Sequence, residues 1–123
     1  MRVLIVDDNQ SFLDAARLLL ERQGVQVVGV ALTSAEALRR AAELRPEVIL
    51  VDVMLGRESG LDLTRRLADQ DGGAAAVILI STLSRADLAE LAVGSRAAGF
   101  LPKSELSADA IGRIAAGGAP AGL

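Results

Sequence analysis

The stretch LIVDDNQ, residues 4–10, places two adjacent carboxylates, Asp7 and Asp8, directly after a short apolar run. A continuous apolar run, as opposed to an alternating one, is typical of a strand that is buried on both faces of a parallel sheet. Two like charges at the end of such a strand are unfavourable unless a positive group neutralises them. The stretch therefore predicts a buried strand with a charged site at its carboxyl end.

Similar apolar runs recur at residues 25–32, 48–51, 77–80 and, more weakly, 100–101. The segments between them show helical spacing of apolar residues and predict five helices. Thr33 with Glu36, and Ser84 with Asp87, indicate capping boxes, and the helix after Ser84 is expected to run toward Gly99. The predicted apolar stripes are Phe12, Ala16, Leu19 and Leu20; Ala35, Leu38 and Ala42; Leu61, Leu63 and Leu67; Leu88, Leu91 and Ala92; and Ile111 with Ile114.

Five strand-then-helix units with short connections predict a doubly wound α/β fold, with a five-stranded parallel sheet and five helices on its two faces. Ligands of such sheets bind outside the carboxyl ends of the strands. The periodicity alone does not determine the order of the strands. The residues just past each apolar run are therefore the candidates for a functional site.

The composition limits the class of protein. The chain has 123 residues, 51% of them hydrophobic and 24% charged, which indicates one globular domain. A net charge of −3 without a dense basic cluster argues against direct binding of nucleic acid. The absence of Cys and His excludes thiolate and imidazole chemistry. No apolar run is long enough to span a membrane, and we expect a cytoplasmic protein.

The predicted strand ends bring together three acids, a hydroxyl and a cation: Asp7, Asp8, Asp52, Ser81 and Lys103. A carboxylate cluster without His or Cys is suited to a hard divalent cation, and Mg²⁺ fits it best. Mg²⁺, an ammonium and a hydroxyl can together stabilise a phosphoryl group. An aspartate can itself be the nucleophile. Asp52, which stands alone after VILV, is the better candidate for that role, whereas the adjacent pair suits metal binding.

At these positions the chain resembles the receiver domains of two-component response regulators. The resemblance rests on VDD, VDVMLGRESG, ILIST and GFLPKS, which occur in that order over nearly the whole chain. The separations also agree: 44 residues from Asp8 to Asp52, 29 more to Ser81 and 22 more to Lys103. Each motif alone is weak, but four in order are specific. The resemblance implies the strand order 2-1-3-4-5.

The resemblance further implies a role for each site residue. Asp52 would accept a phosphoryl group from the phosphohistidine of a sensor kinase or a phosphotransfer protein. Asp8 would bind Mg²⁺ directly, Asp7 largely through water, and the backbone carbonyl of Met54 would complete the protein ligands. The phosphoryl oxygens would then be contacted by two further side chains, Ser81 and Lys103.

The family's switch pair falls on Ser81 and Phe100, the latter being an aromatic without the hydroxyl of the more usual Tyr. The surface of the fourth helix, fifth strand and fifth helix would then carry the output. Gly56 replaces the Pro that commonly follows the phosphoacceptor strand, so a mobile loop is expected there. Met54 and Leu83 are apolar at positions that tune hydrolysis of the acyl phosphate, which predicts a long-lived phosphoryl state.

Several alternatives stay open at this point. The acidic pair could be a solvated turn, or part of an N-cap with Asn9 that serves the first helix. The chain could be a pseudo-receiver that only binds partners, or the excised receiver of a transcription regulator, since GFLPKSELS resembles such proteins. An aspartyl-phosphate phosphatase would need a second acid at Met54. We expect a receiver over residues 1–118 with a flexible tail at 119–123, and we favour a stand-alone receiver over an excised domain. We expect a phosphoacceptor that is not an enzyme, with a downstream protein target and possibly a homodimer.

Overall fold

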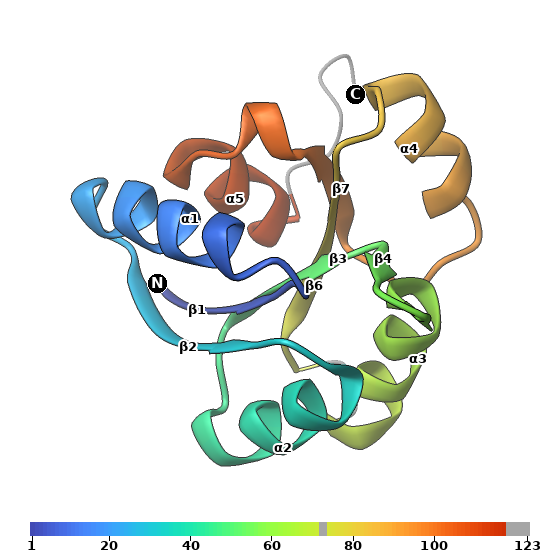
Figure 1. Cartoon of the computed structure of the whole chain (residues 1–123), viewed down its shortest axis with the longest axis horizontal. Coiled ribbons are helices and arrows are strands. Elements are labelled where there is room, and N and C mark those ends of the chain that lie inside the picture. Colours follow the sequence, from blue (N-terminus) through green and yellow to red (C-terminus); the bar gives the residue numbers. More distant parts are fainter. Residues whose placement is uncertain (72–73, 118–123) are drawn as a thin grey trace.

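The computed structural model describes residues 1–71 and 74–117, so the predicted tail at 119–123 and most of the Asp71-Gly72-Gly73 turn lie outside the described residues. The strands of the main sheet alternate with helices along the chain (Figure 1). The helices are α1 (Gln10–Arg22), α2 (Ser34–Leu44), α3 (Gly60–Asp71), α4 (Arg85–Ala92) and α5 (Ala108–Ala115), with a short 3₁₀ helix, η1 (Lys103–Glu105), before α5. None of the helices in the described part is long and apolar enough to cross a membrane.

The main sheet contains five parallel strands in the order β2-β1-β3-β6-β7. Counted along the main sheet alone, this is the order 2-1-3-4-5, so the doubly wound fold class is confirmed. The sheet places the ends of β1 and β3 side by side at its centre, where ligands of this fold bind. The strands are β1 (Arg2–Val6), β2 (Gln26–Ala31), β3 (Val48–Asp52), β6 (Ala76–Ser81) and β7 (Gly99–Pro102).

Two further short strands, β4 (Met54–Leu55) and β5 (Glu58–Ser59), pair antiparallel in the segment after β3. The sequence indicated only a mobile loop here. Gly56 takes a left-handed conformation, with φ of 60°, which a residue with a side chain adopts less readily. The glycine thus permits the tight reversal that lets the two strands pair.

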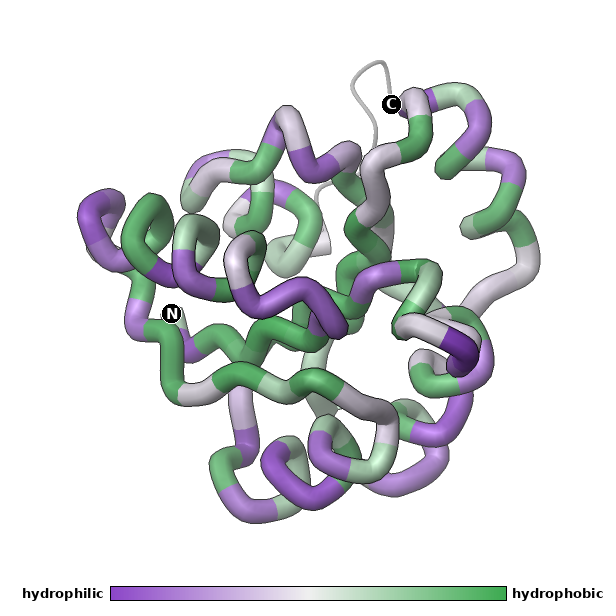
Figure 2. Tube along the Cα trace, viewed as in Figure 1, coloured by the Kyte–Doolittle hydropathy of each residue, from purple (hydrophilic) through white to green (hydrophobic). Residues whose placement is uncertain are grey.

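The sheet separates two apolar cores, because successive side chains of a strand point to opposite faces. In β1, Val3 and Ile5 pack with α1 and α5, whereas Leu4 and Val6 pack with α2, α3 and α4. Figure 2 shows the central strands as mostly hydrophobic along their length, whereas hydrophobic and hydrophilic residues alternate along the helices. Strands that are apolar on both faces explain the continuous runs in the sequence.

The buried stripes of the helices differ in part from the predicted ones. Leu13, which the spacing did not indicate, is buried in α1, whereas Leu19 is 40% exposed. In α2 the buried face carries Ala37 and Ala41, while Ala35 and Ala42 are exposed. These helices have small or apolar residues on neighbouring faces, so spacing alone does not select the one that meets the sheet. Packing against the sheet makes that choice.

The predicted caps are present, but one helix is shorter than expected. The hydroxyls of Thr33 and Ser84 each accept a hydrogen bond from the backbone N–H three residues later. In a capping box the side chain at Glu36 would accept a hydrogen bond from the N–H of the cap residue, Thr33. The Glu36 carboxylate instead accepts one of 2.7 Å from the N–H of the preceding residue, Leu32. The fourth helix ends at Ala92 well before Gly99, because the chain turns at Gly94, whose φ is 76°.

Candidate functional site

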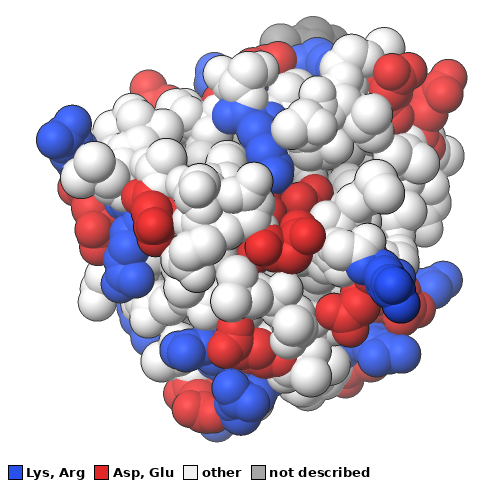
Figure 3. Space-filling view, viewed as in Figure 1, with Lys and Arg blue, Asp and Glu red and all other residues white. Residues whose placement is uncertain are grey.

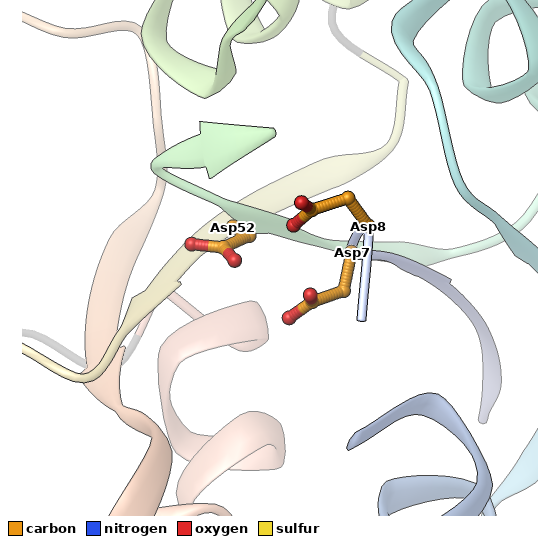
Figure 4. A group of neighbouring side chains, drawn as sticks. All are labelled: Asp7, Asp8 and Asp52. Carbon is orange, nitrogen blue, oxygen red and sulfur yellow. The ribbon is translucent and has the colours of Figure 1, made fainter. Parts of the chain in front are cut away.

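Three carboxylates converge at the carboxyl ends of the two central strands. Asp7 and Asp8 follow β1, Asp52 ends β3, and one oxygen of each lies within 4.8 Å of the others (Figure 4). Asp7 is fully buried and Asp52 is 8% exposed, whereas Asp8 is exposed to solvent. In Figure 3 acidic side chains gather at the centre of the view, with basic side chains directly above them. The predicted cluster therefore forms a partly buried site that is open on one side.

Backbone hydrogen bonds hold Asp7 at the end of β1. Its N–H donates to the Ala31 carbonyl at 3.0 Å, which continues the pairing with β2. Its Oδ1 accepts a hydrogen bond of 2.9 Å from the Asn9 N–H, and the Asn9 side chain in turn accepts one of 3.1 Å from the Phe12 N–H. Asn9 is thus the N-cap of α1, as one alternative proposed, and its own N–H binds the Asp7 carboxylate at the same time.

Asp52 is fixed by the turn that follows it. Its Oδ1 accepts a hydrogen bond of 3.2 Å from the Met54 N–H, and the Gly60 N–H donates to the Val53 carbonyl at 2.8 Å. A Cβ at Gly60 would lie 1.9 Å from the Asp52 carbonyl oxygen, a distance that no side chain tolerates. Glycine is therefore required at the start of α3 so that this helix can approach the end of β3.

Lys103 brings a positive charge to the carboxylates. From the start of η1, its Nζ lies 2.6 Å from Asp7 Oδ2 and 3.2 Å from Asp52 Oδ2. Burial lowers the pKa of Lys103, but the hydrogen bond to Asp7 and the charges of both carboxylates outweigh it and hold the pKa above its usual value. The ammonium therefore stays charged in this site at neutral pH.

Asp52 experiences opposing effects. Burial raises the pKa of its carboxyl most strongly, the hydrogen bond from Met54 lowers it, the charge of Asp7 raises it and the charge of Lys103 lowers it. The net result is a pKa above the ordinary value of 3.8. A raised pKa means that the ionised carboxylate is less stable here than in water. A further positive group bound beside it would stabilise the ionised form.

Ser81 and Phe100 lie at the edge of the site toward β7. Ser81 ends β6 one position beyond the residue that pairs with Asp52, is buried, and accepts a hydrogen bond of 3.1 Å from the Leu83 N–H. Phe100 is partly buried in β7, with the guanidinium carbon of Arg85 5.7 Å from the centre of its ring. The role of the Met54 carbonyl as a metal ligand stays a prediction.

The donor set fits the magnesium ion that the resemblance implies. Its side-chain donors are all carboxylate oxygens, which Mg²⁺ prefers, and the exposed Asp8 leaves room for the waters that Mg²⁺ keeps. Asp7 Oδ2 is buried, and its partner among the described residues is the Lys103 ammonium, 2.6 Å away, which leaves one lone pair of this oxygen available. Such an atom has spare capacity for a cationic partner.

Some contacts at the site were not indicated by the sequence. Phe12 belongs to the predicted stripe of α1, yet its ring lies 4.2 Å from Lys103 Nζ. Arg85 in α4 forms an ion pair with Glu105 in η1, and its guanidinium lies over the ring of Phe100. These contacts join residues that are distant in the sequence, and neither pair forms a motif that spacing could reveal.

Comparison with known proteins gives one consistent result. The family model described as "Response regulator receiver domain" matches residues 3–115. A putative transcriptional regulator of Pseudomonas aeruginosa is 34% identical over 104 residues, which are 85% of this chain and 50% of that protein. The chain spans 32% and 50% of the lengths of two of the curated relatives that it matches.

Solved structures agree with this match. A LuxR-family two-component response regulator from Aurantimonas sp. SI85-9A1 has a TM-score of 0.83 at 30% identity, covering 94% of this chain and 85% of that one. A response regulator from Burkholderia pseudomallei, solved with a phosphorylated aspartic acid, a calcium ion and citrate, has a TM-score of 0.77 at 31% identity, covering 92% and 65% of the respective chains.

Proposed function

Because this chain belongs to the response regulator receiver domain family, we propose that it is a phosphoacceptor switch in which Asp52 carries the phosphoryl group. One observation carries the proposal: three carboxylates and the Lys103 ammonium meet at the carboxyl ends of the central strands. The similar Burkholderia pseudomallei protein, solved with a phosphorylated aspartic acid, supports the same chemistry.

The proposed step is a transfer from a phosphohistidine of a sensor kinase or a phosphotransfer protein. A carboxylate oxygen of Asp52 attacks the phosphorus, the phosphorus–nitrogen bond breaks, and the electron pair stays on the imidazole nitrogen, which takes up a proton. The product is an acyl phosphate on Asp52. Magnesium, held by Asp7, Asp8, Asp52 and the Met54 carbonyl, would supply positive charge to the phosphoryl oxygens.

Lys103 and Ser81 would contact the transferred group. The Lys103 ammonium already lies 3.2 Å from Asp52 Oδ2, so it can follow the added negative charge with a small movement. Ser81 accepts a backbone hydrogen bond through its oxygen, which leaves its own O–H free to donate to a phosphoryl oxygen. Movement of Ser81 would allow Phe100 to change its rotamer beneath Arg85.

The output would follow from that movement. The surface formed by α4, β7 and α5 borders both Ser81 and Phe100, and we assign the contact with a downstream protein, or with a second copy, to this surface. The chain would thus signal by changing shape without turning over a separate substrate. The relative that is named a transcriptional regulator favours a role in transcription for the whole protein.

The test uses the full chain with Mg²⁺ and either acetyl phosphate or beryllofluoride. We expect intact mass to increase by one phosphoryl group, and the melting temperature to rise with beryllofluoride, because a ligand that binds only the folded state stabilises it. Asp52→Asn should abolish both effects. Asp109→Asn, which changes an exposed acid in α5, is the matched control and should behave as the wild type. An unchanged mass and melting temperature in the wild type would refute the proposal.

A further inference from the structure

We propose that Phe12 is a positioning residue of the phosphoacceptor site, whose ring face holds the Lys103 ammonium against the carboxylates. The inference rests on the proposed function, since it concerns how Lys103 is prepared for a phosphoryl group. Lys103 Nζ lies 4.2 Å from the centre of the Phe12 ring, well within the roughly 6 Å over which a cation is attracted to an aromatic face.

The ammonium has partners on several sides. Asp7 and Asp52 contact it at 2.6 and 3.2 Å, and the Phe12 ring takes a further position that water would otherwise occupy. The Lys103 side chain is only 15% exposed, so the attraction to the ring is weakly screened. A lysine has a long flexible stem, and each fixed partner reduces the number of conformations that the ammonium samples.

The Phe12 ring is tied to the same carboxylate that the lysine binds. Asp7 Oδ1 accepts from the Asn9 N–H, and Asn9 Oδ1 accepts from the Phe12 N–H. The ring then faces Lys103, which returns to Asp7. This closed series of contacts means that the first turn of α1 sets the position of the ammonium relative to the acidic pair.

An aromatic partner differs from a third carboxylate in one important respect. A carboxylate would neutralise the ammonium and compete with the phosphoryl oxygens for it, whereas a neutral ring attracts the cation without cancelling its charge. The ring can therefore orient Lys103 before phosphorylation and leave its full charge available afterwards.

Phe12 also packs against the apolar core beneath α1, so packing and orientation have to be separated. Phe12→Leu keeps an apolar side chain but removes the aromatic face. Phe12→Tyr and Phe12→Trp keep that face. Fluorinated phenylalanines introduced at position 12 by nonsense suppression keep the size of the ring and progressively weaken its negative face.

A direct readout comes from Lys103 itself, because it is the only lysine in the sequence. Isotope-labelled lysine therefore gives a single set of side-chain NMR signals. Without Mg²⁺, the ε-methylene protons of the wild type should be shifted upfield by the ring. We expect Phe12→Leu to lose this shift, and the Tyr and Trp variants to keep it. Packing alone would not produce this spectroscopic signature.

The functional readout is the rate of phosphorylation by acetyl phosphate at saturating Mg²⁺. We expect this rate to fall about three- to tenfold in Phe12→Leu and to fall progressively with fluorination, while the Tyr and Trp variants stay within about twofold of the wild type. Melting temperatures establish that each variant folds. If Phe12→Leu does not fold, the fluorinated series decides.

The possible failures are distinguishable. If the wild type is phosphorylated but neither the lysine signal nor the rate responds to the leucine and fluorinated variants, Phe12 is only a packing residue and the inference is wrong, whereas the proposed function stands. If the wild type takes no phosphoryl group, the proposed function fails and the role of Phe12 fails with it, whatever the NMR signal shows.

Discussion

Asp52 is held in a position where its charge is costly. Its side chain is 11% exposed, it lies close to the buried Asp7, and its pKa is raised, first by burial and then by the neighbouring carboxylate. Lys103 and the Met54 N–H offset part of this effect. The fold therefore keeps this carboxylate in an environment that disfavours its charge, and a metal ion bound beside it would reduce that cost, which is a common arrangement at functional sites.

Asp52→Asn should stabilise the metal-free protein at neutral pH. Because the folded-state pKa of Asp52 is raised, the folded state binds more protons than the unfolded state as the pH rises above 3.8, and stability falls over that range. Removing the charge should raise the free energy of unfolding by about 1 kcal/mol at pH 7. The gain should vanish below pH 3.8, where both states are protonated. Urea unfolding in EDTA at several pH values measures it, and a less stable variant at pH 7 would contradict the account.

Gly60→Ala should damage the site through the backbone of Asp52. The added Cβ would lie 1.9 Å from the Asp52 carbonyl oxygen, so β3 and α3 have to move apart. We expect a loss of about 2 kcal/mol or more in the free energy of unfolding, together with slower phosphorylation. Gly112→Ala is the matched control, because a Cβ there meets nothing within 4 Å. In a helix interior, that change should stabilise by about 0.5 to 1 kcal/mol. Equal effects of both substitutions on urea unfolding would refute the steric argument.

The helices are anchored to the sheet unequally. Of the eight residues in α4, Leu88 is the buried one, whereas α1 buries Leu13, Ala16 and Leu20. Leu91, which the sequence placed on the buried face of α4, is 40% exposed. The pair between Arg85 and Glu105 links α4 to η1, but both side chains are about half exposed, and such pairs contribute little.

Amide exchange should therefore show α4 as less protected than α1. Because α4 buries fewer apolar side chains than α1, the free energy of its local opening should be lower by about 2 kcal/mol. Hydrogen exchange of the unphosphorylated protein, followed by NMR, measures this residue by residue. With beryllofluoride, exchange should change around residues 82–88 and 100–104. Equal protection of α1 and α4 would contradict the argument that α4 is anchored more weakly to the sheet.

The elements and their order along the chain could be predicted from the sequence, but some contacts between them could not. Continuous apolar runs locate the strands because both faces of the sheet are covered. The carboxyl ends of parallel strands share one edge, so the sequence places Asp7, Asp8 and Asp52 at the same edge, and the strand order that the resemblance implies makes them neighbours there. Three other features depend on how the elements pack: the buried stripe of α2, the β4–β5 pair and the contact of the Phe12 ring with Lys103. The periodicity of apolar residues in one sequence does not contain that information.

The two apolar cores are joined through the strands that separate them. Ile49 packs toward α2, α3 and α4, whereas the next residue, Leu50, packs toward α1 and α5, and both are fully buried. A strand that unpacks from one core must also unpack from the other, because the side chains on its two faces are attached to one backbone. The cores should therefore unfold together, as is usual for a domain of this size.

Leu13→Ala and Leu63→Ala test this directly, since each removes a side chain that is 1% exposed from one of the two cores. Each should lower the free energy of unfolding by about 2 to 5 kcal/mol, the range for leucine truncations in a core. Unfolding should remain a single transition in both variants. The chain has neither Trp nor Tyr, so far-UV circular dichroism and methyl NMR signals from each face are the suitable probes. If the methyl groups of one face were lost at lower urea than those of the other, the cores would be independent, and a change at α4 would not need to reach the face that α1 covers.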